Sequence, residues 1–214
     1  MTGKSSEDPF APEAFFRRAA ARLRSMPPSA MDAVSGDHRL NPGFEPPPDI
    51  RYRNAAVLVP VVARQPQAAV ILTLRTVSLK DHSGQIAFPG GKIGPDDGGP
   101  AATALREAEE EIGLPRFSVS LVGYLDAYLT GTGFRVVPVV GRVEPDHALT
   151  PNPAEVADAF EVPLSFLMNP ENHRVGSRVL GGAVRNFYEM PFGDRYIWGA
   201  TAGIIRALYE RVYG

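Results

Sequence analysis

The stretch REAEEEIGL, which begins at Arg106, concentrates carboxylates at Glu107, Glu109, Glu110 and Glu111. At about 100° per residue on an α-helix, Glu107, Glu110 and Glu111 share one face, and Glu109 lies outside it. Like charges at this spacing repel one another. One explanation is a solvated acidic surface, on which Arg106 pairs with Glu110. The other is a divalent cation, because carboxylate oxygens clustered on a rigid face suit Mg²⁺ or Mn²⁺.

Helix signals surround this stretch. Pro100 suits the first helical position, and Gly113 suits a left-handed C-terminal cap. Between them, the spacing of apolar residues predicts a stripe that faces the core, made of Ala101, Leu105, Ala108 and Ile112. The three grouped glutamates are then predicted to lie on nearly the opposite side of the helix from the core.

The wider segment FPGGKIGPDDGGPAATALREAEEEIGL, residues 88–114, resembles the signature box of the Nudix hydrolases. From Arg106 onward the match is complete, except that the small Ala108 stands at the first aliphatic position. The upstream part departs from the family pattern. The loop after Gly91 looks one residue longer, and Asp96 and Asp97 lie near the place of the usual glutamate.

The preceding segment, ILTLRTVSLKDHSGQIAFPGG, resembles a signature of one Nudix subgroup, the coenzyme A pyrophosphatases. The shared features are Leu72, Thr73, Arg75, Leu79, His82, Gly84, Gln85 and the run from Phe88 to Gly91. The stretches NPAEV and YIWGATAGII are also similar, so the resemblance spans about residues 52–212. It implies cleavage of coenzyme A, or an acyl-CoA, at its pyrophosphate to give 4′-phosphopantetheine and adenosine 3′,5′-bisphosphate.

The resemblance also implies which residues hold metal. Glu107 and Glu111 are the expected direct ligands of Mg²⁺ or Mn²⁺, and Glu110 is expected to join through a further ion or a water. The carbonyl of Gly91 can add an oxygen ligand, since a glycine turn brings backbone close to the site. Arg106 is expected to position a glutamate through a charge-assisted hydrogen bond.

The general base stays open between three glutamates. Glu110 or Glu111 can take a proton from water, and so can Glu155 in the loop TPNPAEV. The alternative for Glu155 is a carboxylate at a helix N-terminus, where the helix dipole favours it.

The phosphates of such a substrate require cations and polar contacts. Arg75, Lys80 and Lys92 lie in or beside the subgroup signature and are the candidate cations, with ordinary surface charge as the alternative. Gln85 and His82 are the candidate polar contacts. His82 is expected to shape its loop or to touch substrate rather than to act in catalysis.

Periodicity predicts the elements that must position these residues. Buried-strand patterns occupy residues 55–63, 68–75, 119–129 and 134–144, and a second hairpin is predicted over 183–192 and 195–198. The segment from Thr201 to Tyr213 predicts a helix with an apolar stripe. The segment NPAEVADAFEVPLSFLM predicts a loop followed by a short helix. The order predicts an α+β fold with a mixed β-sheet between helices, the α/β/α Nudix fold that the resemblance implies.

Residues 1–48 differ from the rest and are predicted to form an arm ahead of a Nudix domain at 49–214. PEAFFRRAAARLRSM predicts a short amphipathic helix with Phe15, Ala19 and Leu23 on its apolar face. A proline-rich connector follows it. We expect the arm to pack on the domain, with contact to a membrane or an acidic partner as the alternative.

Bulk properties exclude several classes of function. The net charge is −2, so nothing global points to nucleic acid or to an anionic membrane. The 214 residues include no cysteine, which excludes disulfides, thiolate metal sites and cysteine nucleophiles. No apolar run has the length of a membrane span, and no secretory signal is evident, so a cytoplasmic location is expected.

Other functions stay open. The substrate can instead be another nucleoside diphosphate derivative, such as ADP-ribose or a dinucleotide, or the chain can be a non-catalytic ligand-sensing Nudix module. Retention of all three grouped glutamates favours catalysis over sensing. The sequence leaves open whether the protein is a monomer or a homodimer.

Overall fold

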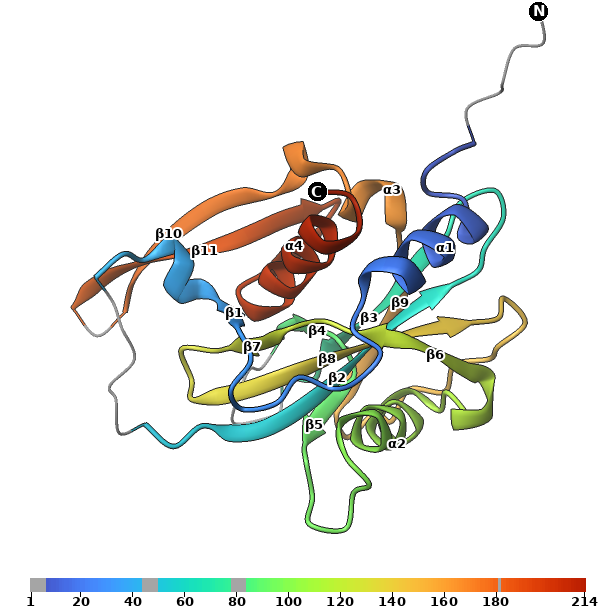
Figure 1. Ribbon diagram of the computed structural model, residues 1–214, viewed down its shortest axis with the longest axis horizontal. Coiled ribbons are helices and arrows are strands. Elements are labelled where there is room, and N and C mark those ends of the chain that lie inside the picture. The colour runs from blue at the N-terminus through green and yellow to red at the C-terminus, as the bar shows by residue number, and fades with distance from the viewer. Residues whose placement is uncertain (1–6, 44–49, 78–83, 181) are drawn as a thin grey trace, which may run out of the picture.

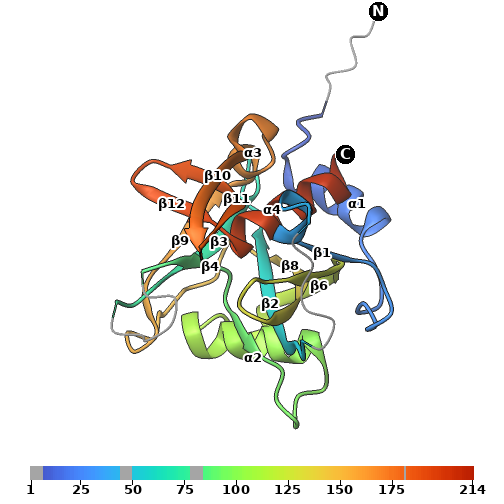
Figure 2. The same cartoon turned by 90° about the vertical axis from the view of Figure 1, so that its left-hand side faces the viewer.

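The computed structural model describes residues 7–43, 50–77, 84–180 and 182–214. A mixed β-sheet lies between helices (Figures 1 and 2). Helix α2 (Pro100–Ile112) covers one face, and helices α1 (Pro12–Arg22) and α4 (Ala200–Val212) lie on the other. The predicted α+β, α/β/α architecture is confirmed.

The large sheet has the order β1-β7-β8-β2-β3-β4, with β5 on β2, β6 on β8 and β9 on β3. Its strands are β1 (Val34–Gly36), β2 (Arg53–Val62), β3 (Ala69–Arg75), β4 (Ile86–Ala87), β5 (Gly90–Lys92), β6 (Val119–Tyr124), β7 (Ala127–Leu129), β8 (Phe134–Val143) and β9 (Val156–Pro163). The sheet is mixed because β2 runs parallel to β8 and antiparallel to β3. The segment between β2 and β3 contains the sequence QPQ.

Two apolar cores flank this sheet. On the α2 side, Ala104, Ala108 and Ile112 pack on inward residues of β2 and β8. On the other side, the stripe of α4 and the apolar face of α1 are buried in the second core, which includes Phe15, Ala19, Ile204, Ile205 and Leu208. The sheet is therefore buried on both faces, which fixes its register and holds α2 rigidly.

A small antiparallel sheet packs beside α4. It consists of β10 (Arg174–Leu180), β11 (Ala183–Phe192) and β12 (Arg195–Trp198). The β11–β12 hairpin was predicted, and β10 was not. The short helix α3 (Leu164–Leu167) was also predicted, but strand β9 precedes it where the sequence suggested a loop. Three one-turn 3-10 helices complete the element set of the described chain: η1 (Asp37–Leu40), η2 (Arg116–Ser118) and η3 (Pro170–Asn172).

The arm is integrated with the body of the molecule. Phe15 is fully buried, and the carbonyl of Phe10 accepts a hydrogen bond from Ala68 N. The arm also contributes β1, which pairs in parallel with β7. Because the apolar face of α1 is covered, packing on the domain is the observed arrangement. None of the described helices is both long and apolar enough to span a membrane.

Candidate active site

Helix α2 carries the grouped glutamates and has the predicted limits. It starts at Pro100 and ends at Ile112, and the φ of 66° at Gly113 is the left-handed cap conformation. Ala108 and Ile112 are buried as expected, whereas Ala101 and Leu105 are only partly buried, because Thr103 and Ala104 take up the rest of the core contact. The glycine turn that leads into β5 lies against this helix.

Glu111 is the most buried glutamate of the group, at 4% exposure. Its Oε2 accepts a hydrogen bond of 3.2 Å from the backbone N–H of Gly90. Burial raises the pKa of Glu111 to about 7; the Gly90 N–H and Arg75 oppose this rise, and the charges of Glu107 and Glu155 add to it. The alternative of a solvated acidic surface does not hold for Glu111, because the glycine turn covers that part of the helix.

Glu107 lies one helical turn earlier, against the same glycine turn. A Cβ placed on Gly91 would lie 2.4 Å from Glu107 Oε1, so a side chain there would displace the Glu107 carboxylate from the strand. Burial raises the pKa of Glu107 as well, and its ion pair with Arg106 opposes the rise. Glu107 and Glu111 thus face the same backbone turn.

Arg106 connects the helix to the loop before it. Its Nε and Nη2 donate to the two carboxylate oxygens of Asp97, each at 3.0 Å, and its Nη1 lies 3.0 Å from Glu107 Oε1 and 2.9 Å from Glu110 Oε2. The pairing of Arg106 with Glu110 was foreseen. Arg106 therefore holds three carboxylates, which is the geometry of a positioning group.

Asp97 was not selected as a site residue from the sequence. It accepts hydrogen bonds from Gly94 N (2.8 Å) and Thr103 Oγ1 (2.9 Å) in addition to those from Arg106. These donors hold the pKa of Asp97 far below its usual range, with Arg106 as the largest cause. One feature of the sequence pointed to Asp97. It lies near the position of the upstream glutamate of the common Nudix box, in a loop that is one residue longer than in that box.

The other two glutamates of the stretch face outward. The side chain of Glu110 is 57% exposed. Glu109 is paired with Arg116 at 2.6 Å and takes no part in the cluster, as its helical position predicts. The three grouped glutamates thus divide into an inner pair, Glu107 and Glu111, and an outer member, Glu110.

Two candidates from other elements, Arg75 and Glu155, approach the inner pair, and Gln85 contacts the backbone of Arg75. Arg75, at the end of β3, places Nη1 3.8 Å from Glu111 Oε1, and its buried Nε has no hydrogen-bond partner among the described atoms. The backbone carbonyl of Gln85 accepts a hydrogen bond from Arg75 N. Glu155 lies close enough for its charge to raise the pKa of both Glu107 and Glu111.

Glu155 lies in a turn that leads into β9, and its backbone carbonyl accepts a hydrogen bond from Thr76 N. The suggestion that it stands at a helix N-terminus is wrong, because a strand follows it. Lys92 is exposed on β5, and no ion pair joins it to the described carboxylates. The predicted substrate contacts Lys80 and His82 lie outside the described residues.

The donors at this site suit a hard divalent cation. Glu107 and Glu111 are partly desolvated carboxylates, the charge of Glu107 raises the pKa of Glu111, and a dication relieves that repulsion. Within the described ranges, no three acidic or histidine side chains lie close enough together to form a preformed metal-binding site. Glu107 is instead paired with Arg106, so a shared ion requires the carboxylates to turn toward one another.

Comparison with known proteins identifies this architecture. A family model for the NUDIX domain matches residues 52–180. The layered fold with its glutamate helix defines a hydrolase that acts on pyrophosphate bonds. The chain belongs to the Nudix hydrolases, which generally use divalent metal ions such as Mg²⁺ or Mn²⁺.

Curated relatives support the assignment over most of the chain. The "Uncharacterized Nudix hydrolase NudL" of Photorhabdus laumondii is 40% identical over 171 residues, which cover 78% of this chain and 91% of the relative. Its namesake from Escherichia coli K12 is 38% identical over 159 residues, with 74% and 82% covered. The crystal structure of a MutT/nudix family protein from Enterococcus faecalis shares the fold, with a TM-score of 0.51 at 16% identity, covering 79% of this chain and 65% of that one.

Proposed function

We propose that this Nudix hydrolase cleaves the pyrophosphate of coenzyme A or an acyl-CoA, with Mg²⁺ or Mn²⁺, into 4′-phosphopantetheine and adenosine 3′,5′-bisphosphate. The observation that carries the substrate assignment is the segment 71–91, which resembles the coenzyme A pyrophosphatase signature. Within it, Arg75 Nη1 lies 3.8 Å from Glu111 of the glutamate helix, and Gln85 bonds to Arg75 through its backbone carbonyl.

Glu107 and Glu111 would hold the divalent ions, with Glu110 and the carbonyl of Gly91 as further oxygen donors. When bound, such ions neutralise phosphoryl oxygens and acidify an attacking water. Arg106, fixed by Asp97, keeps the Glu107 carboxylate at the glycine turn. Glu107 and Glu111 are assigned as the main ligands because they form the inner pair at the glycine turn, and Glu110 is assigned a secondary role because it faces outward.

Arg75 is the cation best placed to bind a substrate phosphate. Its Nε is buried without a hydrogen-bond acceptor, and a phosphate oxygen would supply one. Glu155 and Glu111 are the two carboxylates placed to accept the proton of water near that phosphate. Glu155 has the advantage that it is not needed to hold an ion in this arrangement.

A substrate panel tests the proposal directly. Purified protein with Mg²⁺ or Mn²⁺ is incubated with coenzyme A, acetyl-CoA, ADP-ribose, a dinucleoside polyphosphate and a nucleoside triphosphate, and the products are identified by mass. Release of adenosine 3′,5′-bisphosphate is expected. If coenzyme A stays intact while ADP-ribose is hydrolysed, the substrate assignment is wrong.

A matched pair of variants separates an enzyme from a sensing module. Glu111→Gln removes an inner carboxylate, and Glu109→Gln removes an outward charge of the same helix. Catalysis predicts a large loss of turnover in the first and little change in the second. A sensing module predicts no turnover in any of the proteins and unchanged ligand affinity.

A further inference from the structure

A polar cavity lies on the α4 side of the sheet, on the face opposite the one that α2 covers. It has a volume of about 440 Å³, and its walls include Arg22 at the end of α1, Ser35 and Arg39 from the arm, and Arg211 from α4. An adjoining hollow of about 210 Å³ shares Ser35 and Arg39 with it. The cavity is therefore bounded by the arm on one side and by α4 on the other.

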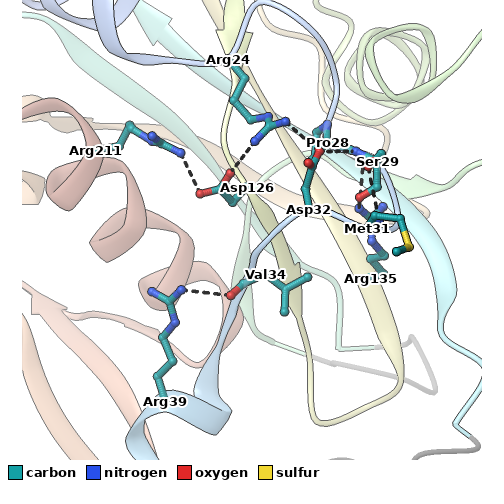
Figure 3. A network of polar contacts seen from close by, with 10 residues as sticks. All are labelled: Arg24, Pro28, Ser29, Met31, Asp32, Val34, Arg39, Asp126, Arg135 and Arg211. Atoms are coloured by element: carbon teal, nitrogen blue, oxygen red, sulfur yellow. Dashed lines mark hydrogen bonds and ion pairs between the residues drawn. The ribbon is translucent and has the colours of Figure 1, made fainter.

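Positive charge exceeds negative charge in these walls. Four arginines (Arg22, Arg39, Arg206 and Arg211) line the two hollows against two carboxylates, Asp126 and Glu210. Both carboxylates are already paired. Asp126 accepts from Arg24 at 3.3 Å and from Arg211 at 2.7 Å, and Glu210 accepts from Arg206 at 2.7 Å. Figure 3 shows Arg24 and Arg211 reaching Asp126 from different elements.

The two remaining arginines, Arg22 and Arg39, bind backbone oxygens. Arg22 Nη1 donates to the carbonyl of Val212 (2.9 Å) and to an oxygen of Gly214 (3.1 Å), the last described residue, and Arg39 Nη2 donates to the carbonyl of Val34 (3.0 Å). In the part of the chain that the structure describes, neither forms an ion pair with an Asp or Glu side chain. Each guanidinium has five N–H donors, so donors remain on both.

We propose that this cavity binds a small phosphate-bearing anion between Arg22 and Arg39. The guanidinium fork matches phosphoryl oxygens, and both arginines keep N–H donors that the contacts described above do not use. The hydroxyl of Ser35 adds a further donor at the same wall. The site is separate from the glutamate helix and does not depend on the identity of the hydrolysed substrate.

An occupant would join the arm to the body of the molecule. Arg39 and Ser35 belong to the arm, whereas the opposite wall is α4. A ligand that binds both walls only in the folded state stabilises that state, and the stabilisation rises with the logarithm of one plus the ratio of ligand concentration to dissociation constant. The site therefore connects the concentration of a phosphate compound to the docking of the arm.

Titration with inorganic phosphate tests the proposal in metal-free protein with a chelator present. Amide chemical shifts of Gly36 and Gly203, which line the adjoining hollow, report occupancy of this cavity. We expect saturable shifts in the unmodified protein. In Arg39→Gln and in Arg22→Gln, we expect the affinity for phosphate to fall by about tenfold or more. Sodium chloride at the same ionic strength is expected to give no saturable change.

Two control variants locate the binding. Arg17→Gln removes an exposed arginine of α1 that pairs with Glu7, and Arg75→Gln removes the cation of the candidate active site. Both are expected to bind phosphate at the cavity like the unmodified protein. Absence of saturable shifts, or loss of them in Arg75→Gln with retention in Arg39→Gln, overturns the proposal. If Arg39→Gln fails to fold, Arg39→Lys replaces it. This variant keeps the charge but loses the paired N–H donors of the guanidinium, so it is also expected to bind phosphate more weakly.

Discussion

The buried carboxylate of Glu111 is the residue on which the chemistry of α2 depends. A glutamate with a pKa of about 7 is half protonated at neutral pH, and its burial opposes ionisation. The same features that destabilise the anion favour a bound dication, because positive charge near a desolvated carboxylate is worth more than in water. The ionised Glu111 therefore destabilises the metal-free folded state, and the same carboxylate favours binding of a dication.

Glu111→Gln is expected to abolish most turnover yet to stabilise the metal-free protein at alkaline pH. The pKa of Glu111 is raised from 4.5 to about 7, so the folded state binds its proton more tightly than the unfolded state. Stability is then present below pH 4.5 and falls as pH rises toward 7. Replacing Glu111 with glutamine removes this pH-dependent loss of unfolding free energy, which is about 3 kcal/mol at most.

The measurement is urea unfolding at pH 5 and pH 8 with chelator. The variant should gain stability relative to the unmodified protein at pH 8 and little at pH 5. Glu109→Gln, whose carboxylate is outward, should show no such difference. Equal stability of Glu111→Gln and the unmodified protein at pH 8 contradicts the burial of an ionisable Glu111.

At the scale of elements, two contacts set the position of α2. The loop before it is fastened by Asp97, and the strand beside it approaches through Gly91. Both contacts act on Glu107, one through Arg106 and the other through direct packing. The precision of the site therefore comes from the loop and the strand as much as from the helix.

Asp97→Asn is expected to lower kcat about tenfold or more and to leave the fold intact. The variant keeps a side chain of the same shape but loses the charge that binds Arg106 through two hydrogen bonds. Arg106 is then free to pair more closely with Glu107 and to compete with metal. Steady-state kinetics at several metal concentrations checks this, with exposed Asp96→Asn as the matched control. Equal losses in both variants contradict a specific role for Asp97.

Gly203→Ala is expected to destabilise the protein by roughly 2 kcal/mol, although alanine is the better helix former. A Cβ at this position of α4 would lie 1.9 Å from the hydroxyl oxygen of the buried Tyr128. Thermal unfolding of the single variants and of Gly203→Ala combined with Tyr128→Leu gives the test. The double variant should recover part of the loss, because the clash has been removed. Strict additivity contradicts the clash.

At the scale of the whole molecule, Tyr128 also links the arm to the sheet. Its hydroxyl donates to Asp37 Oδ1 at 2.5 Å, and Asn41 bonds across to the backbone of Asn186 in β11. Burial raises the pKa of Asp37, and the Tyr128 hydrogen bond opposes that rise. These contacts fix η1 and β1 at one wall of the arginine-lined cavity.

Tyr128→Phe is expected to loosen the arm by about 1–3 kcal/mol, because the Asp37 carboxylate loses its buried donor. Hydrogen exchange of the backbone amides between Val34 and Asn41 measures the effect. Faster exchange is expected there and not in α2, which lies on the opposite face. Uniformly faster exchange across the molecule points instead to a general loss of packing.

The parts of the fold that could be predicted from sequence are those with one dominant signal. Strands β2, β3 and β8 are runs of Val and Ile because both of their faces are buried. Strands β9 and β10 were missed because each pairs with a single described neighbour and carries polar residues on its exposed side.

The site was predictable to a similar degree. The spacing of α2 separates Glu109 from the other glutamates, and the resemblance points to Arg75 and Glu155. The burial of Glu111 and the anchoring of Arg106 by Asp97 were not predictable, because both depend on how a loop and a strand from outside the helix pack against it.

The two ends of the described chain meet in space. Tyr213 donates to the carbonyl of Pro9, and Arg22 bonds to Val212 and Gly214, although about 200 positions separate these partners along the chain. During synthesis, α1 therefore emerges from the ribosome long before the helix that covers its apolar face. The packing of α1 is therefore completed only when almost the whole chain has been made.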